Sequence, residues 1–242
     1  MSGLLLSFLL AAVPTIIAIT LHEAAHGYAA LAMGDDTARQ AGRLSLNPLA
    51  HVDRVGTILL PGVLLVSQLL TLHRVAFMFG WAKPVPVSAW KFRDPRRGMM
   101  VVAAAGPAMN FLLAWIGAVL LHVVPLLRGG LQGAVLQFLF YFMLANIVLG
   151  AFNLIPLPPL DGGRIAVGLL PLKLARRWAR LERLGIVLVL LLLFVVPALA
   201  RSAGFAFDPL RTLLVAIAEP VLRLVLALAG HPAAGAALLG DD

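Results

Sequence analysis

Two histidines and a glutamate lie close together in the stretch TLHEAAHGY, residues 20–28, within an otherwise apolar segment. His22 and His26 are four residues apart, so on a helix both imidazoles project from one face and can bind one metal ion. Glu23 can reach a water molecule on that metal and take its proton. This H-E-x-x-H pattern is typical of zinc hydrolases, in which two nitrogen ligands are combined with a general base.

The apolar surroundings of this motif favour a function for it. Ionisable side chains are costly in the hydrocarbon of a membrane, so three of them within five positions need a purpose. The alternative is a set of polar groups that only form hydrogen bonds between helices. A catalytic zinc would also need a third protein ligand and an open coordination position.

Asp161 is the strongest candidate for the third ligand, because the chain has no cysteine. It lies in PPLDGGR, directly after a segment broken by prolines. Asp161 could also cap the helix that follows, and the two roles are compatible. His51 with Asp53 forms a rival pair in a polar loop. The other histidines lie at the ends of apolar segments, where a solvated side chain is the simplest interpretation: His73, His122 and His231.

The composition is that of a polytopic membrane protein. Of the 242 residues, 61% are hydrophobic and 12% are charged, whereas soluble domains are about half apolar and a quarter charged. The net charge is +8, but 12 of the 19 Lys and Arg side chains fall in residues 74–97 and 164–183. Both clusters flank apolar runs, as the positive-inside rule expects. We therefore expect a lipid bilayer, and no nucleic acid, as the surroundings of this chain.

Apolar segments predict membrane helices, and the segment at 131–152 runs into the prolines at 156, 158 and 159. Irregular backbone at membrane depth is tolerated only where protein buries it or where it lines a wet cavity, so this break marks a functional place. The proline-rich stretch FGWAKPVPVSAWKFRDPRR, residues 79–97, predicts an extended edge strand or a loop near the membrane surface, and 164–183 predicts a basic interfacial helix. The predicted membrane helices cover about 3–33, 99–124, 131–152, 184–200 and 210–229.

The expected fold class is therefore an all-α polytopic membrane protein. It has a three-helix catalytic core, extra transmembrane helices and a short membrane-associated strand or hairpin region. We expect a single domain over 1–242, with the catalytic core at about 3–170 and accessory helices at about 184–229.

The two halves of the metal site must lie at one depth, which constrains the topology. The first apolar segment and the 131–152 segment should therefore end on the same side of the membrane. They do so only if one of the two apolar segments between them, 55–72 and 99–124, fails to cross. We expect 55–72 to be re-entrant, with its turn at Pro61 and Gly62. The positive-inside rule then places the basic clusters and the opening of the site on the cytoplasmic side.

Three motifs on successive apolar segments carry a family resemblance. HEAAH at 22–26, GPAMN at 106–110 and FNLIPLPPLDGG at 152–163 resemble, in this order, the site-2 protease family of intramembrane zinc metalloproteases. The stretches NPLAHVD and GWAKPVPV are similar to a compact bacterial branch of that family. No segment resembles the PDZ or CBS domains that other members carry.

The resemblance implies a function and a set of site residues. The protein would be a zinc metalloendopeptidase of the cell (inner) membrane, cleaving a peptide bond within or next to a transmembrane segment of a membrane protein substrate. Glu23 would activate a water on the zinc, Asn153 would contact substrate, and Asn110 would support the site by hydrogen bonds between helices. One zinc ion per chain would be held by His22, His26 and Asp161.

Other functions fit the sequence less well. A metal-binding membrane transporter would need further acidic or histidine residues on the other spans, and few are present. A di-iron membrane oxygenase needs many more histidines than the six in this chain. A proteolytically inactive scaffold would have no need of an intact Glu23 and Asp161.

Overall fold

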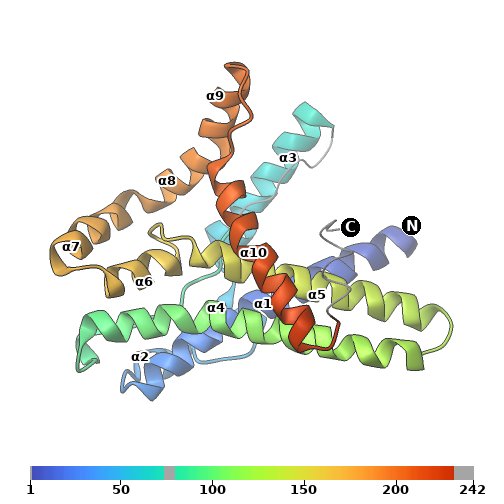
Figure 1. Ribbon diagram of the computed structural model, residues 1–242, viewed down its shortest axis with the longest axis horizontal. Coiled ribbons are helices and arrows are strands. Elements are labelled where there is room, and N and C mark those ends of the chain that lie inside the picture. Colours follow the sequence, from blue (N-terminus) through green and yellow to red (C-terminus); the bar gives the residue numbers. More distant parts are fainter. Residues whose placement is uncertain (1, 74–79, 232–242) are drawn as a thin grey trace.

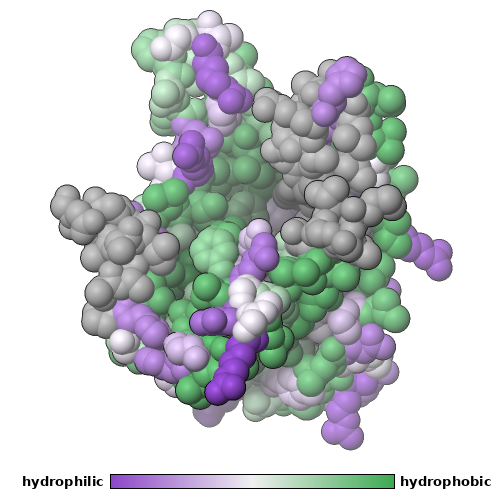
Figure 2. All heavy atoms as spheres, turned by 90° about the vertical axis from the view of Figure 1, so that its right-hand side faces the viewer, coloured by the Kyte–Doolittle hydropathy of each residue, from purple (hydrophilic) through white to green (hydrophobic). Residues whose placement is uncertain are grey.

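The computed structural model describes residues 2–73 and 80–231, and within them every regular element is helical. Four helices there are long and apolar enough to cross a membrane: Leu9–Ala32, Pro95–Leu126, Gly130–Leu154 and Leu172–Ser202. Figure 2 shows apolar residues over wide parts of one face of the molecule. The all-α polytopic class is confirmed.

Three helices form the core of the molecule: α1 (Ser2–Ala32), α4 (Pro95–Leu120) and α5 (Gly130–Leu154). In Figure 1, α1 and α5 run in the same direction and α4 runs opposite to them. Small residues allow this close packing. A Cβ atom on Gly117 of α4 would lie 2.9 Å from Met143 of α5, and one on Gly150 of α5 would lie 2.6 Å from Phe111 of α4. The parallel course of α1 and α5 agrees with the topology expected from the metal site.

The outer face of α4 carries large apolar side chains at helical spacing, which are exposed in the isolated chain: Leu112, Trp115, Ile116 and Val119. Positions i, i+3, i+4 and i+7 lie on one face of a helix. An exposed apolar stripe of this kind is what a bilayer covers.

The helix α5 ends at Leu154, and the chain turns back into α6 (Asp161–Leu169). Two glycines in the first turn of α6 make this fold possible. A Cβ on Gly162 would collide with the Leu154 carbonyl, and one on Gly163 would collide with the backbone of Pro158. The DGG sequence therefore lets the start of α6 press against the proline-broken loop.

The region between α1 and α4 leaves the core and returns to the same end of it. It contains α2 (Thr37–Gln40), η1 (Pro48–His51), η2 (Arg54–Leu59), α3 (Leu60–Leu72) and η3 (Ala89–Lys91). The two ends of the region are tied together, because the Lys91 ammonium lies 2.6 Å from the Asp36 carboxylate and the Ser88 amide donates to Asp35 at 2.6 Å. The region as a whole thus makes no net crossing of the bundle.

The predicted turn at Pro61 and Gly62 is wrong, since the chain is helical without a break from Arg54 to Leu72. Pro61 lies in the first turn of α3. The chain is already helical before Pro61, so its missing N–H takes a donor from the preceding turn, and the Gly56 carbonyl there accepts from the Trp81 amide at 3.1 Å instead. α3 is not among the four helices that meet the length of a membrane span within the described residues, and in Figure 1 it points away from the core.

Of the strand or loop expected in the proline-rich stretch, the described residues 80–88 show an extended loop that forms no strand ladder. Pro84 and Pro86 have no N–H to give to a neighbouring strand. The neighbouring amides are used elsewhere: Lys83 donates to the His51 carbonyl at 2.8 Å, and Val85 donates to the Glu23 side chain at 3.1 Å.

The predicted basic helix at 164–183 is divided. α6 ends at Leu169, and α7 (Leu172–Arg180) begins after Pro171. Arg96 of α4 holds the division in place by donating to the carbonyls of Gly168 and Leu170, both at 2.6 Å. α7 continues through η5 (Leu181–Leu184), α8 (Gly185–Leu190) and η6 (Leu191–Val195) to α9 (Val196–Ser202).

The last helix, α10 (Pro209–Leu228), packs against α4 and α5. Their shared apolar cluster includes Ala114, Ile147 and Leu226. α10 was expected to span the membrane, but its three charged residues keep it out of the four candidate spans found in the described part of the chain: Arg211, Glu219 and Arg223. η4 (Leu121–Leu126) extends α4 toward the turn into α5.

Candidate metal centre

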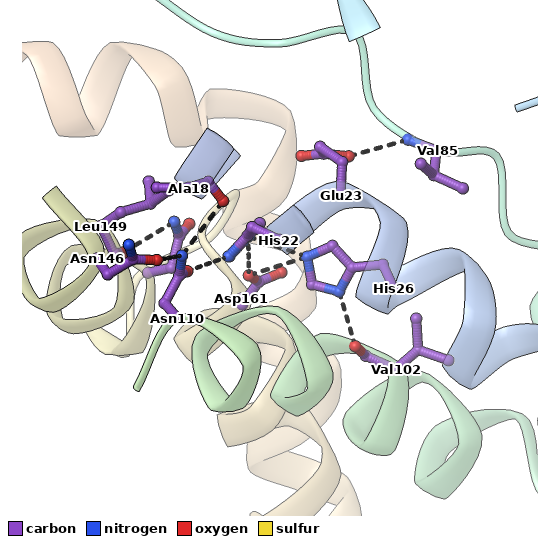
Figure 3. Close-up of polar contacts among 11 residues, drawn as sticks. Ala18, His22, Glu23, His26, Val85, Val102, Asn110, Asn146, Leu149 and Asp161 are labelled. Carbon is purple, nitrogen blue, oxygen red and sulfur yellow. Dashed lines mark hydrogen bonds and ion pairs between the residues drawn. The ribbon is translucent and has the colours of Figure 1, made fainter. Parts of the chain in front are cut away.

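Three potential ligand atoms converge where α1, α4 and α6 meet (Figure 3). The Nε2 atoms of His22 and His26 are 3.1 Å apart. The Oδ2 atom of Asp161 lies 3.2 Å from the first and 3.3 Å from the second. The fold therefore joins side chains that are about 135 positions apart in sequence into one nearly equilateral triangle.

The other nitrogen of each imidazole faces a group that accepts hydrogen bonds. His22 Nδ1 lies 2.6 Å from Asn110 Oδ1, and His26 Nδ1 lies 2.7 Å from the Val102 carbonyl. In the neutral rings Nδ1 is then the protonated nitrogen, and both Nε2 atoms turn a lone pair toward the Asp161 carboxylate. Three electron-rich atoms in a buried place call for a cation between them.

The triangle has the size that zinc requires. Tetrahedral zinc with ligands at about 2.0–2.1 Å has ligand atoms about 3.3–3.4 Å apart. Asp161 Oδ2 is buried and has no hydrogen-bond donor among the described residues, which leaves it free to bind a metal. The donor set of two histidines and one carboxylate fits zinc, and His22 and Asp161 are only 4% and 7% exposed.

Gly106 of α4 closes the site on one side. A Cβ atom at this position would lie 2.5 Å from His26 Cε1 and 2.6 Å from His22 Cε1. α4 can therefore approach both rings only because residue 106 has no side chain. The histidines are held by α4 through the Val102 carbonyl, the Asn110 amide and the backbone at Gly106.

Asp161 does not cap the helix that follows it. α6 begins at Asp161 itself, its N-cap position is Leu160, and no side chain caps it. The carboxylate points at the two histidines instead. The metal-ligand geometry is thus present, and the alternative of a capping role is wrong.

Glu23 lies beside this triangle. One carboxylate oxygen of Glu23, one ring nitrogen of His22 and one ring nitrogen of His26 all lie within 4.8 Å of one another. The Oε2 atom of Glu23 accepts the amide hydrogen of Val85, at 3.1 Å. The extended segment 80–88 is therefore tied to the glutamate at Val85.

The asparagines predicted for the site have different positions. Asn110 contacts His22 and is fully buried between helices, together with Asn146 of α5, which the sequence reasoning did not identify. An amide side chain near the middle of an apolar span was the available signal for Asn146. Asn153 donates to the Leu149 carbonyl one turn back on α5, at 3.1 Å.

His51, Asp53, His122 and His231 have partners away from the three converging side chains. His51 lies 2.8 Å from the Ser45 carbonyl, and Asp53 caps η2 by accepting from Val55 and Gly56. His122 and His231 stack on each other, with ring centroids 4.2 Å apart. His73 and His122 are exposed, as expected for histidines at the ends of apolar segments.

Comparisons with known proteins agree with this geometry. The sequence model of peptidase family M50 matches residues 130–196, which include Asp161. YwhC of Bacillus subtilis, named as a candidate zinc metalloprotease, is 39% identical over 215 residues, covering 86% of this chain and 91% of that protein.

Two further relatives are more distant. The zinc metalloprotease MJ0392 of Methanocaldococcus jannaschii is 38% identical over 90 residues, which is 37% of this chain and 25% of that protein. Rip2 of Mycolicibacterium smegmatis, also named as a candidate zinc metalloprotease, is 29% identical over 195 residues, 80% of this chain and 70% of that protein. No solved structure matches the chain. The relative in Bacillus subtilis spans nearly the whole chain, and we conclude that this chain belongs to peptidase family M50, the site-2 protease family of metalloproteases.

Proposed function

We propose that the protein is an intramembrane zinc metalloendopeptidase that hydrolyses a peptide bond within or next to a transmembrane segment of a membrane protein substrate. The observation that carries the proposal is the convergence of His22, His26 and Asp161 between apolar helices. A hydrolytic site at this depth would meet the helices of other membrane proteins before it meets soluble chains.

His22, His26 and Asp161 would together hold one zinc ion per chain. A bound zinc supplies Lewis-acid chemistry, since it polarises a carbonyl and lowers the pKa of a water to about 7. With three protein ligands the fourth position stays open, as hydrolysis requires. The three side chains are fixed before any substrate arrives, because α4 contacts both rings and α6 presents the carboxylate.

Glu23 would act as the general base. It takes one proton from the attacking water while the water oxygen bonds to the scissile carbonyl carbon. It then gives this proton to the amide nitrogen as the C–N bond breaks, so that a carboxylic acid and an amine leave. The Val85 amide supports this role, because its hydrogen bond to Oε2 holds the carboxylate beside the histidines.

The extended segment 80–88 is the proposed place for an unwound substrate. The amides of Trp81, Lys83 and Val85 are bonded to Gly56, His51 and Glu23. Pro84 and Pro86 leave the opposite edge with carbonyls and without donors between Ala82 and Val87. A substrate strand would therefore bind mainly through its own N–H groups, and Asn153 at the end of α5 would contact it near the site.

We place the protein as a single domain over 1–242 in the cell (inner) membrane, with the site opening toward the cytoplasm. The support for this orientation is the charge distribution. Arg96 and Arg97 lie in the first turn of α4 and Arg93 lies just before it, and α7 carries four further cations. The positive-inside rule assigns such an end to the cytoplasm.

Product mapping tests this proposal. The protein is reconstituted in liposomes with a panel of single-span model proteins, and the products are sequenced by mass spectrometry. Cleavage should fall within or next to the span, stop with a zinc chelator and return with added zinc. Products that arise only in soluble parts of the substrates, or that persist with the chelator, would contradict the proposal.

A further inference from the structure

Asn146 lies in the middle of α5 and has no exposed surface. It stands outside every motif that predicted the site. An unpaired amide within an apolar span costs free energy, so its side chain must find partners within the bundle. The partners it has lead directly to the metal site.

A directed series of hydrogen bonds connects α5 to His22. The Asn146 NH₂ group donates to the Phe142 carbonyl at 2.8 Å, and the Asn146 Oδ1 atom accepts from Asn110 Nδ2 at 2.9 Å. The Asn110 Oδ1 atom then lies 2.6 Å from His22 Nδ1. All three of these side chains are 4% exposed or less.

The direction of the series follows from its end. The Phe142 carbonyl can only accept, so Asn146 must turn its NH₂ toward Phe142 and its oxygen toward Asn110. Asn110 must then present its NH₂ to Asn146 and its oxygen to His22. His22 can meet that oxygen only by donating from Nδ1, which leaves the Nε2 lone pair for the metal.

A second acceptor for Asn110 is longer. The Ala18 carbonyl lies 3.3 Å from Asn110 Nδ2. The NH₂ group has two hydrogens, one for each acceptor, and the closer acceptor is Asn146. Removing Asn146 would leave one buried hydrogen without a partner and weaken the constraint on the orientation of Asn110, without abolishing it.

We propose that Asn146 is a positioning residue of the metal centre: it fixes the orientation of the Asn110 amide and thereby keeps His22 Nε2 free and aimed at the metal ion. The proposal rests on the proposed function in one respect, that His22 binds a metal. A hydrogen-bond partner of a metal-binding histidine fixes the tautomer of that histidine and raises the affinity of the site for the metal. Asn110 is such a partner of His22, and Asn146 bonds to Asn110 in turn.

The test compares zinc affinities, measured by chelator competition on the full chain in nanodiscs. Asn146→Leu removes both polar groups at similar size. Asn146→Asp keeps them, because burial favours the neutral acid, whose carbonyl accepts from Asn110 and whose hydroxyl donates to Phe142. Ile147→Ala is the matched control, since Ile147 is the next residue on α5, is 4% exposed and packs toward α10.

Asn146→Leu should bind zinc about 10-fold more weakly, at the low end of the range for residues behind a ligand. Asn146→Asp should stay within about threefold of the wild type, and Ile147→Ala should lose stability but not affinity. Wild-type affinity in Asn146→Leu, or an equal loss in all three variants, would overturn the proposal. If Asn146→Leu does not fold, Asn146→Ala takes its place with the same outcomes. Wild-type protein that binds no zinc would instead refute the metal site itself.

Discussion

At the residue scale, the site depends on atoms whose chemistry is visible in the sequence and on others that are not. The types and spacing of His22, Glu23 and His26 predict a metal site, and the search for a third ligand leads to Asp161. The Val102 carbonyl and the Val85 amide could not be predicted, because backbone groups are the same at every residue. Only the fold brings them to the histidine and the glutamate.

Asp161 should be essential for metal binding. Asp161→Ala removes the carboxylate that lies 3.2 and 3.3 Å from the two histidines. Zinc affinity should fall by more than about 100-fold, since losing a ligand costs more than losing a residue behind one. Asp53→Ala is the control, because Asp53 caps η2 away from the site. Equal zinc content in both purified variants would remove Asp161 from the site.

Gly106 should tolerate no side chain. In Gly106→Ala, the new methyl carbon would lie 2.5 Å from Cε1 of His26 and 2.6 Å from Cε1 of His22. Both distances are too short for carbon atoms that are not bonded, so α4 or the rings must move. We expect a loss of zinc affinity and a cost of about 1–3 kcal/mol in stability, as for other overpacked sites. Gly133→Ala on α5 has open space and serves as the control. Isothermal titration with zinc and thermal unfolding measure both effects, and unchanged zinc binding in Gly106→Ala would contradict the packing described.

At the element scale, long apolar runs predicted the helices, and prolines were the main source of error. The prolines after α5 do break the helix, as expected. Pro61 does not, because the Gly56 carbonyl in the preceding turn accepts from the Trp81 amide in place of the missing N–H. Pro84 and Pro86 produce extended backbone but prevent a strand ladder. The effect of a proline therefore depends on its place in an element, which the sequence leaves open.

The buried Asp35 connects the end of α1 to the extended segment. Burial alone would raise the pKa of its carboxyl, but hydrogen bonds from Thr37 and the Ser88 amide, with the charge of Lys91, hold that pKa below its ordinary value. The stabilisation is therefore complete above the unfolded-state pKa of about 3.9 and is lost as the pH falls through the lower folded-state pKa.

Asp35→Asn should accordingly lower the free energy of unfolding at pH 7 by about 1.5–3 kcal/mol, the range for hydrogen bonds to a charged group. The difference from the wild type should shrink as the pH falls below about 4. Thermal unfolding across this pH range measures it. Asp94→Asn is the control, since Asp94 caps α4 and asparagine caps equally well. A difference that grows toward low pH would refute this account of Asp35.

At the scale of the whole molecule, the topology could be predicted from the sequence only through the candidate metal site. The two halves of the site must share one depth, so α1 and α5 must run parallel, and they do. The sequence could not show how the 33–94 region returns to its starting side. The chain does not return by a turn within one helix. The whole region makes the return, and two contacts close it: Asp35 with Ser88, and Asp36 with Lys91.

Single cysteines can test this topology cleanly, because the chain has none of its own. Gln40→Cys and Ala179→Cys place exposed thiols in α2 and α7, and Leu126→Cys places one at the other end of α4, where Leu126 is 78% exposed. An impermeant maleimide should label the first two only in inverted vesicles and the third only in right-side-out vesicles. The cysteine-free parent is the control, and labelling of all three from one side would refute the orientation.

The central claim is that Glu23 moves the proton in a zinc-dependent hydrolysis, and Glu23→Gln tests it most directly. The amide keeps the size of the side chain but cannot accept the proton. In liposomes with a single-span model substrate, the variant should keep the zinc content of the wild type and lose cleavage by at least about 100-fold, the contribution expected of a general base. Cleavage by Glu23→Gln at the wild-type rate, with zinc bound, would contradict the claim.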